Sequence, residues 1–369
     1  MPLATEGIVA TYADLIRPEQ KLVGPAGQGA AMRRIRWVRG VVACGLAGAL
    51  VGVVQGQVSA EVGRTRCRAT AFVTGVPVST IDAKTRTKHP TDIPNGTGVA
   101  VTPDGKTAFV GTPTGVSTID VKTRTKHPTD IAVGPVVEVA ITPDGTTVFV
   151  THGGTSVAMV DVNTRTKHPT DIAVGTFLGG MAITPDGKTA FVVDRDTNSV
   201  WLIDVKTRTK HPTDIPVGSL PWGVAVTPDG KTAFVTNLGS GTVSTIDVKT
   251  KTKHPRDISV GSVPFGVAFT PDGNTAFVTN NGSGTVSTID VKTRTKHPTD
   301  IPVGANPKGV ALTPDGKTAF VTNANLVMEP VGPGGNSVST IDVKSRKKHP
   351  TDIPVGVQPL RVAVAPCRR

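Results

Sequence analysis

Several residue types and patterns are scarce in this chain of 369 residues. It contains three cysteines and one tyrosine, and aromatic residues make up 4% of it. No stretch of the repeated part places apolar residues at the spacing of an amphipathic helix, which argues against a helical fold. We find no G-x-S-x-G, no phosphate-cradling glycine loop and no cluster of metal ligands. We therefore expect a protein that is not an enzyme and that uses no metal or cofactor.

What the chain has in abundance is repetition. Near-identical copies of V-S-T-I-D-V-K-T-R-T-K-H-P-T-D-I-P-V-G alternate with copies of G-V-A-V-T-P-D-G-K-T-A-F-V-T-N. A period near 40 residues indicates a radial or stacked repeat fold. The histidine of K-H-P marks the seven copies, with spacings of 38, 41, 43, 43, 43 and 52 residues: His89, His127, His168, His211, His254, His297 and His349.

Each copy predicts four short strands. Strand A is G-V-A-V, strand B is T-A-F-V-T, strand C is V-S-T-I-D-V and strand D is K-H-P-T-D-I-P-V. The Asp-Gly of T-P-D-G supplies a tight turn between A and B, and β-branched and aromatic residues favour the strands. Four antiparallel strands in such a period are typical of a propeller blade. We predict an all-β, seven-bladed β-propeller of four-stranded blades, with a parallel β-helix as the alternative.

The strand B segments carry a family resemblance. Ala233–Asn237, Ala276–Asn280 and Ala319–Asn323 read A-F-V-T-N. Together with T-P-D-G and I-D-V, these segments resemble the YVTN-type β-propeller repeat family, with Phe in place of the family's Tyr. The resemblance covers about residues 69–366 and implies the propeller of a secreted or surface protein. Relatives include surface-layer proteins, an extracytoplasmic single-stranded-DNA binder, and more distant lactonases and lyases.

The two ends of the repeated region are complementary. The chain enters with a strand B at Thr70–Thr74 and leaves with a strand A at Arg361–Pro366, so we expect both to complete one blade. Cys67 and Cys367 each take the Asp position of the broken turn between these strands. We predict a disulfide that closes the ring there. Two separate surface thiols are the alternative.

The N-terminal part of the chain differs from the repeats. Residues 32–60 read as a signal peptide, with a basic start, an apolar run from Val41 to Val54 and a small-residue cleavage site. Residues 1–31 would be an extension or a wrongly assigned start, and residues 61–369 the propeller. An uncleaved anchor is the alternative, although the apolar run is short for a membrane span. We expect an extracytoplasmic, monomeric protein with no transmembrane span in the mature chain.

Positive charge is concentrated in one turn of the repeat. The formal net charge is +12, and much of the excess lies in K-T-R-T-K-H between strands C and D. A ring of such turns could attract anionic partners: cell-wall polymers, lipid head groups or nucleic acid. Alternatively, Lys and Pro protect the exposed edge strand of each blade from aggregation. The repeated histidines lack the further ligands that a zinc site needs.

The copies differ in the loops that enter strand A and in those between strands B and C, which should lie on one face around the channel. Aromatic residues beside a cation and amides could stack on a planar or sugar ligand. We predict a non-catalytic binding protein of the cell envelope, whose partner is an envelope protein, a glycan or an anionic polymer. The predicted ligand-binding residues are Trp222, Phe265, Lys308, Arg361, His152, Asn237, Asn280, Asn323 and, in a longer sixth loop, Met328.

Three alternatives stay open at this site. Trp222 and Phe265 could pack between blades instead of facing a ligand. The same face could bind single-stranded nucleic acid. Finally, His152 could act as a general base with Asp194 or Asp196 in a lactonase-like hydrolase.

Overall fold

The computed structural model describes residues 69–366, apart from 91–92, 94 and 325–335. The chain divides into two units, residues 1–61 and 62–369, and the fold below is that of the second. No helix within the described ranges is long and apolar enough to cross a membrane. The predicted extension and signal peptide, Cys67, Cys367 and Met328 lie outside the described residues. The predicted export, disulfide, monomeric state and envelope partners therefore stay predictions.

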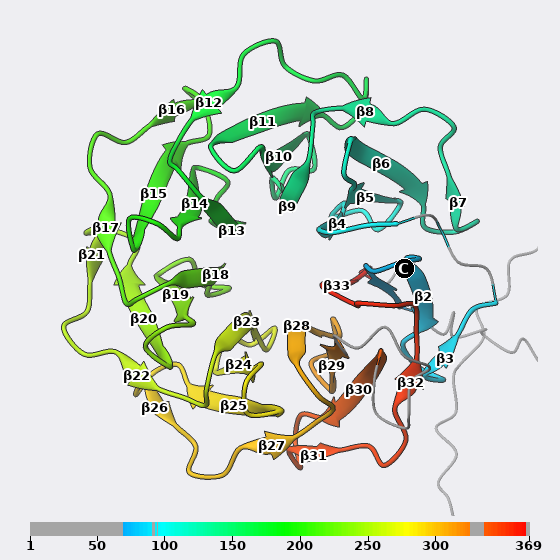
Figure 1. Ribbon diagram of the computed structural model, residues 1–369, viewed down its shortest axis with the longest axis vertical. Helices are drawn as coiled ribbons and strands as arrows, with labels where there is room; N and C mark the ends of the chain where they lie inside the picture. Colours follow the sequence, from blue (N-terminus) through cyan, green and yellow to red (C-terminus); the bar gives the residue numbers. More distant parts are fainter. Residues whose placement is uncertain (1–68, 91–92, 94, 325–335, 367–369) are drawn as a thin grey trace, which may run out of the picture. The chain divides into compact units, whose positions relative to one another are not determined.

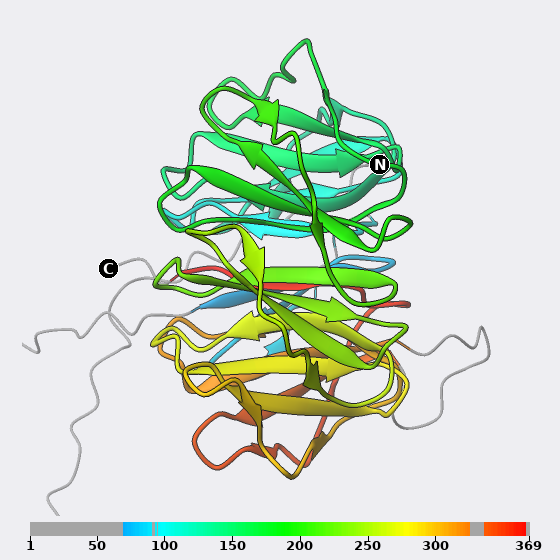
Figure 2. The ribbon, with the colours of Figure 1, turned by 90° about the vertical axis from the view of Figure 1, so that its left-hand side faces the viewer.

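The repeats form seven antiparallel sheets arranged in a ring, which confirms the predicted seven-bladed β-propeller (Figure 1). Strand A of each blade lies nearest the axis, and strands B, C and D follow outwards (Figure 1). Seen from the edge, the strands run across the ring from one face to the other (Figure 2).

The blades are numbered here from the one that holds both chain ends. Blade 1 contains β33 (Val362–Val364), β1 (Thr70–Val73), β2 (Ser79–Asp82) and β3 (Thr87–Lys88). Blade 2 contains β4 (Val99–Val101), β5 (Thr107–Gly111), β6 (Gly115–Asp120), β7 (Thr125–Lys126) and β8 (Ile131–Ala132). Blade 3 contains β9 (Val136–Ile141), β10 (Thr147–His152), β11 (Ser156–Asp161) and β12 (Ile172–Ala173). Blade 4 contains β13 (Leu178–Ile183), β14 (Thr189–Asp194), β15 (Ser199–Asp204), β16 (Thr209–Lys210) and β17 (Ile215–Pro216).

The remaining three blades repeat this order. Blade 5 contains β18 (Pro221–Val226), β19 (Thr232–Asn237), β20 (Thr242–Asp247), β21 (Thr252–Lys253) and β22 (Ile258–Ser259). Blade 6 contains β23 (Pro264–Phe269), β24 (Thr275–Asn280), β25 (Thr285–Asp290), β26 (Thr295–Lys296) and β27 (Ile301–Pro302). Blade 7 contains β28 (Pro307–Leu312), β29 (Thr318–Asn323), β30 (Ser337–Asp342), β31 (Lys347–Lys348) and β32 (Ile353–Pro354).

Strand D differs from the sequence prediction, because it is two short segments rather than one strand. In blade 5, β21 and β22 both pair with β20, at its two ends. After His254, whose N–H still donates to the Thr245 carbonyl oxygen, the P-R-D stretch leaves the sheet, since a proline has no N–H for the ladder. An ion pair of 2.7 Å between Lys253 and Asp257 spans the excursion.

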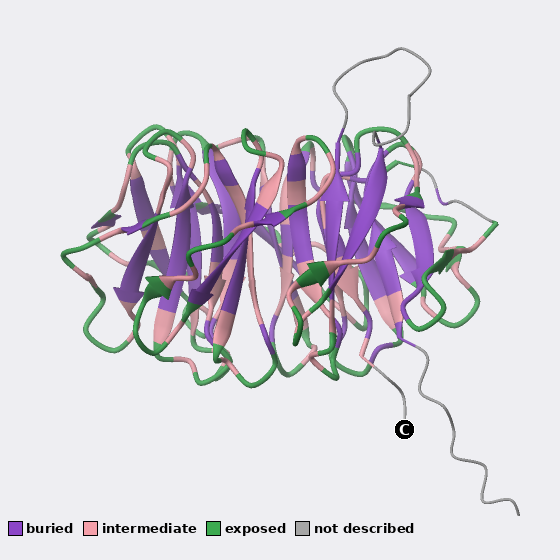
Figure 3. Ribbon diagram, turned by 90° about the horizontal axis from the view of Figure 1, so that it is seen from below, coloured by how far each residue is buried: buried purple, intermediate pink, exposed green. Residues whose placement is uncertain are grey.

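The antiparallel order gives the ring two different faces. In blade 5, Val226 of strand A, Thr232 of strand B and Asp247 of strand C end at the same side. This side therefore carries the A–B and C–D turns and is called the turn face. The opposite side carries the B–C loops and the loops that enter strand A, and is called the loop face. The strands between the two faces are mostly buried, whereas the connections at both faces are mostly exposed (Figure 3).

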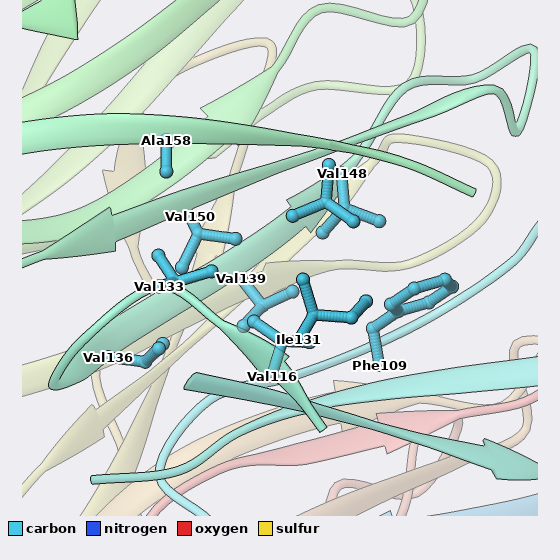
Figure 4. Close-up of a cluster of buried hydrophobic side chains, with 10 residues drawn as sticks. Phe109, Val116, Ile131, Val133, Val136, Val139, Val148, Val150 and Ala158 are labelled. Atoms are coloured by element: carbon cyan, nitrogen blue, oxygen red, sulfur yellow. The ribbon is translucent and has the colours of Figure 1, made fainter. Parts of the chain in front are cut away.

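The phenylalanine of each strand B holds neighbouring blades together. Phe109 of blade 2 packs against valines of blade 3, including Val139 and Val148, in one of seven such clusters (Figure 4). Each cluster joins one blade to the next, so burial of apolar area accumulates around the whole ring. The seven equivalent phenylalanines are all at most 1% exposed: Phe72, Phe109, Phe149, Phe191, Phe234, Phe277 and Phe320.

The two ends of the repeated region share blade 1, as predicted. Strand β1 pairs with β33 through Ala71↔Val364, Phe72↔Ala363 and Val73↔Val362. Phe320 of blade 7 packs into the cluster that contains Ala71 and Val362. The ring is therefore closed by strand pairing and by the same kind of apolar interface as elsewhere.

Candidate functional site

Inner strands approach one another closely at the loop-face end of the channel. The hydroxyl of Thr236 in β19 accepts a hydrogen bond from Gly223 N–H (2.9 Å) and donates to the carbonyl oxygen of Phe265 in the next blade (2.8 Å). A Cβ on Gly223 would collide with that same carbonyl oxygen. The glycine and the threonine of the repeat thus fix the spacing of strands A, which positions every side chain at the mouth.

Two blades replace this glycine with a charged residue. Glu138 and Arg361 take the equivalent position, because their N–H groups also donate to a strand B threonine hydroxyl, at 3.0 and 2.9 Å. Their side chains meet across the channel, with Arg361 Nε 2.7 Å from Glu138 Oε2. Gly98 of the blade between them has no side chain, and a Cβ there would lie 3.1 Å from Glu138 Oε1. The pair is 16% and 12% exposed, so it is largely shielded from solvent.

A pair of aromatic rings lies on the Arg361 side of this ion pair. The ring centroids of Trp222 and Phe265 lie 5.2 Å apart in a tilted arrangement. The guanidinium carbon of Arg361 lies 5.1 Å, and Lys308 Nζ 5.8 Å, from the centroid of Phe265. Both distances are within the range of cation–π attraction. Trp222 and Phe265 are half-buried, and their rings contact each other, so they combine a packing role with exposure at the mouth.

Four of the predicted site residues therefore come together: Trp222, Phe265, Lys308 and Arg361. They line the mouth from blades 5, 6, 7 and 1. Burial, and then the nearby Arg361 guanidinium, lower the pKa of Lys308 from its ordinary value. Behind the mouth lies a channel cavity of about 180 Å³, lined by residues from all seven blades, among them Phe265, Glu138 and Arg361.

Three further residues of this site were not among the predicted ligand-binding residues. Arg195 extends from a B–C loop, with its guanidinium carbon 5.6 Å from the Trp222 ring and 5.5 Å from the Phe177 ring. Phe177 precedes strand A of blade 4 and is 44% exposed. Glu138 could have been chosen because it breaks the glycine register of strand A. For Arg195 and Phe177 the useful signal was weaker, namely a departure from loops that are otherwise small and polar.

His152 does not join this group. It ends β10, and its Nε2 lies 3.1 Å from Asp171 Oδ2, a carboxylate that also pairs with Lys167 at 2.6 Å. The expected partner Asp194 is fully buried and accepts N–H groups from Thr176 and Phe177. Burial raises the pKa of Asp194, but these backbone hydrogen bonds outweigh it and lower the pKa. His152 and Asp194 therefore have different partners and do not form the expected pair.

The three asparagines that end strand B lie inside their blades. Asn237, Asn280 and Asn323 are fully buried. The amide nitrogen of Asn237 donates to Thr242 and Ser244 hydroxyls at 3.0 and 2.9 Å, and the other two repeat this pattern. These amides hold the start of strand C and are out of reach of a ligand in the channel. Within the described ranges, no group of three or more His, Cys, Asp or Glu side chains is arranged to hold a metal ion.

Part of the chain matches a known family. Residues 217–354 match the family described as lactonase, seven-bladed β-propeller. The matched part comprises blades 5, 6 and 7, from which Trp222, Phe265 and Lys308 come. A comparison with curated proteins found no match.

Solved structures with similar folds were also found. Hydrazine synthase from Kuenenia stuttgartiensis is 29% identical, with a TM-score of 0.52, over 59% of this chain and 65% of the synthase chain. The similarity thus spans less than two thirds of that chain. Candidate 6-phosphogluconolactonases from Bacteroides uniformis and Bacteroides fragilis are 15% and 18% identical, with TM-scores of 0.66 and 0.65. They cover 80% and 82% of this chain, and 99% of their own, and at this identity show a shared fold.

The lactonase match contradicts two expectations from the sequence. The prediction of a non-catalytic binding protein was wrong, and so was the prediction that the chain is not an enzyme. The physical reason is that a propeller assembles its site from different blades. Arg361 and Glu138, for example, meet at the channel but are 223 residues apart in sequence, so a search for contiguous motifs cannot find such a pair.

Proposed function

We propose that this protein is a lactonase-like hydrolase whose reaction takes place at the loop-face mouth of the channel. The observation that carries the proposal is the Glu138–Arg361 pair beside Phe265 and Lys308. A carboxylate and two cations converge there in a ring whose other inner positions are mostly glycine or apolar residues. The match of residues 217–354 to the lactonase family supports the reaction class.

The residues at the mouth suit the chemistry of lactone opening. Water adds to the ring carbonyl, negative charge develops on its oxygen, and the ring C–O bond then breaks to give a hydroxy acid. In this proposal Arg361 and Lys308, the two cations beside Phe265, donate hydrogen bonds to the developing oxyanion. Glu138 is the carboxylate beside Arg361; it can accept the proton of the attacking water and return it to the alkoxide oxygen that leaves when the ring C–O bond breaks. The faces of Trp222 and Phe265 offer an apolar wall for the substrate ring.

The finer family relationship is also part of this proposal. We propose that the repeats are of the YVTN type, which the A-F-V-T-N segments support. In blade 5 the threonine bridges neighbouring blades, while the asparagine anchors the start of strand C. The two residues thus have separate structural tasks in the propeller, which accounts for their recurrence as a pair.

The test is hydrolysis of a panel of five- and six-membered lactones, followed by acid release at neutral pH. We expect turnover by the full chain, and a loss of about 100-fold or more in kcat/KM for Glu138→Gln and for Arg361→Gln. The matched control is His152→Ala, which removes a polar side chain of the loop face that pairs with Asp171 and lies off the channel. Thermal unfolding of each variant separates lost catalysis from lost folding.

The outcomes distinguish two assignments of the base. Turnover that survives His152→Ala and is lost in Glu138→Gln supports the proposed site. Turnover that is lost in His152→Ala and survives Glu138→Gln refutes it in favour of the histidine. A folded protein that opens none of the lactones refutes the proposed activity itself.

A further inference from the structure

A second feature lies on the opposite side of the ring, in the seven C–D turns. Each contains the Arg or Lys of the K-T-R-T motif, and six of the seven also contain a second lysine. Eleven of these side chains are exposed, and Arg124 and Arg346 are half-buried. We call them the C–D cations: Lys84, Arg86, Lys122, Arg124, Arg165, Lys206, Arg208, Lys249, Lys251, Lys292, Arg294, Lys344 and Arg346.

Most other lysines near this face are neutralised locally. The A–B turn lysines pair with the aspartate of the same turn, as Lys106 does with Asp104 at 2.9 Å. Five strand D lysines pair with the aspartate four residues along the chain, as Lys126 does with Asp130 at 2.6 Å. Lys210 instead donates a hydrogen bond to the carbonyl oxygen of Val174 and lies over the Trp201 ring. The lysines that protect the edge strands are therefore not the source of the excess charge. That excess comes from the C–D cations.

Each C–D turn also contains one aspartate, but it is held close to the backbone. Asp204 Oδ1 accepts the N–H and the hydroxyl of Thr207, at 2.7 and 2.9 Å. These hydrogen bonds lower the pKa of Asp204, so the carboxylate stays charged within its own turn. The long side chains of Lys206 and Arg208 are exposed beside it. Cations therefore extend towards solvent while the counter-charges stay in the turns.

The backbone conformation of these turns is a second, independent indication that the basic residues have a function beyond forming the turn. The Arg or Lys has a positive φ in all seven, for example 60° at Arg208 and 57° at Lys251. This left-handed conformation is unfavourable for a residue with a Cβ. In the A–B turns the chain meets the same need with glycine, such as Gly145 and Gly230. A cation is kept at seven strained positions where glycine or asparagine would suit the turn better.

Contacts with histidine do not explain all of these cations. Three arginines reach the K-H-P histidine of the preceding blade, as Arg294 does at 3.0 Å from His254 Nε2. Burial, then Arg294, lower the pKa of His254, which favours the neutral imidazole as acceptor. A neutral acceptor leaves the charge of the arginine uncompensated. In the described part of the chain, Lys251 contacts neither an imidazole nor a carboxylate, so no local partner accounts for a basic residue at this position.

The arrangement of the C–D cations around the ring favours a partner with a flat surface. Because the seven blades are equivalent, their C–D turns lie at the same level around the ring, and one plane can touch all of them. The large apolar side chains that are exposed, Val76, Phe177, Leu220 and Val357, belong to the loop face. Aromatic platforms for nucleic-acid bases are thus found on that side and not among the C–D cations.

The entry point of the chain lies on this same side. Ala69 O accepts the N–H of Ala83, at the beginning of the first C–D turn, so the chain enters the propeller at the turn face. The apolar run Val41–Val54, predicted above as part of a signal peptide with an uncleaved anchor as the alternative, precedes Ala69 in the sequence. We propose that the turn face docks on a membrane surface, where the C–D cations bind the anionic headgroups of its lipids. The loop face and its channel mouth then point away from the membrane.

The test uses the full chain and sedimentation with vesicles of phosphatidylcholine alone or with about one third phosphatidylglycerol. Each cation near an anionic surface strengthens binding by about fivefold at low salt. We expect Lys206→Gln with Arg208→Gln to weaken binding to the anionic vesicles by about 25-fold. The control, Lys206→Arg with Arg208→Lys, keeps both charges in the same turn, and lysine already occupies the second position in blade 5 as Lys251. It should change binding by less than about threefold, because the attraction depends on the number of charges near the surface.

The comparison of vesicles removes the contribution of the N-terminal segment, which all variants share. Preferential binding to anionic vesicles that is lost at high salt and in the C–D variant, and kept in the control, supports the proposal. Equal binding to both vesicles, or equal losses in the two variants, overturns it. Retention on an acidic polysaccharide or nucleic acid without preference for anionic vesicles also overturns it, in favour of a linear polyanion.

Discussion

Thr236→Val tests whether the bridging threonine holds adjacent blades together. Valine has nearly the shape of threonine, so the change removes the hydroxyl without opening a cavity. It leaves Gly223 N–H and the Phe265 carbonyl oxygen without their partner, and Thr236 is fully buried. An orphaned buried group costs about 1–3 kcal/mol, so we expect the free energy of unfolding to fall by about 2–3 kcal/mol.

The same substitution at Thr245 provides the matched control. Thr245 lies in the next strand of the same blade and is also fully buried, but its hydroxyl has no hydrogen-bond partner. The equivalent positions in blades 3 and 4 carry Met159 and Leu202. Replacing this hydroxyl by a methyl group removes an unsatisfied polar group, so Thr245→Val should raise the free energy of unfolding by about 1 kcal/mol.

Equilibrium unfolding in urea, read by circular dichroism, measures both changes. Opposite shifts of the midpoint at an unchanged slope support the bridging role. Equal destabilisation by the two variants would refute the reasoning, because only burial and shape would then matter. Since Thr236 bonds the backbone of Phe265, its variant should also raise the KM for a lactone substrate more than the Thr245 variant does.

Three further predictions concern packing, turns and acid. Phe320→Ala should lower the free energy of unfolding by about 3–5 kcal/mol in urea titration, because Phe320 packs at the closing interface with blade 1; a loss below about 1 kcal/mol would mean that this interface is loosely packed. Lys251→Asn should raise the free energy of unfolding by about 1 kcal/mol, since asparagine tolerates a positive φ; a lower Tm in calorimetry would show that the turn is unstrained. The hydroxyl of Thr102, then Lys106, lower the pKa of Asp104 to about 2. Its contribution to stability is therefore complete above about pH 4 and lost as the pH falls towards 2, whereas Asp104→Asn should show a shallower loss in acid titration.

Much of the fold could be predicted from the repeats. Hydrogen bonding and strand preference are local, and each copy contains its own turns, so the period alone specified four antiparallel strands and seven blades. The split of strand D into two short segments was not predicted. The proline of K-H-P-T-D interrupts the pairing with strand C, but the sequence does not show at which residues that pairing stops and resumes. In blade 5 only Thr252–Lys253 and Ile258–Ser259 pair with strand C.

The structure brings together Trp222, Phe265, Lys308 and Arg361, four residues that depart from the repeat, and their binding of a ligand stays a prediction. The burial of the three asparagines could not be predicted, because a polar residue at a strand end can face either the solvent or its own blade. That choice depends on partners such as Ser244, seven residues away across a loop.

The sequence by itself determined the architecture, because identical local units that bury one phenylalanine each must stack, and its complementary ends determined where the ring closes. Only the tertiary structure decided which charges meet. Closure of the ring brings Arg361 within 2.7 Å of Glu138, two blades away and past the bare Gly98. It also places the strained cations of all seven C–D turns on one face. Distances across a channel depend on the diameter of the closed ring, which no single repeat specifies.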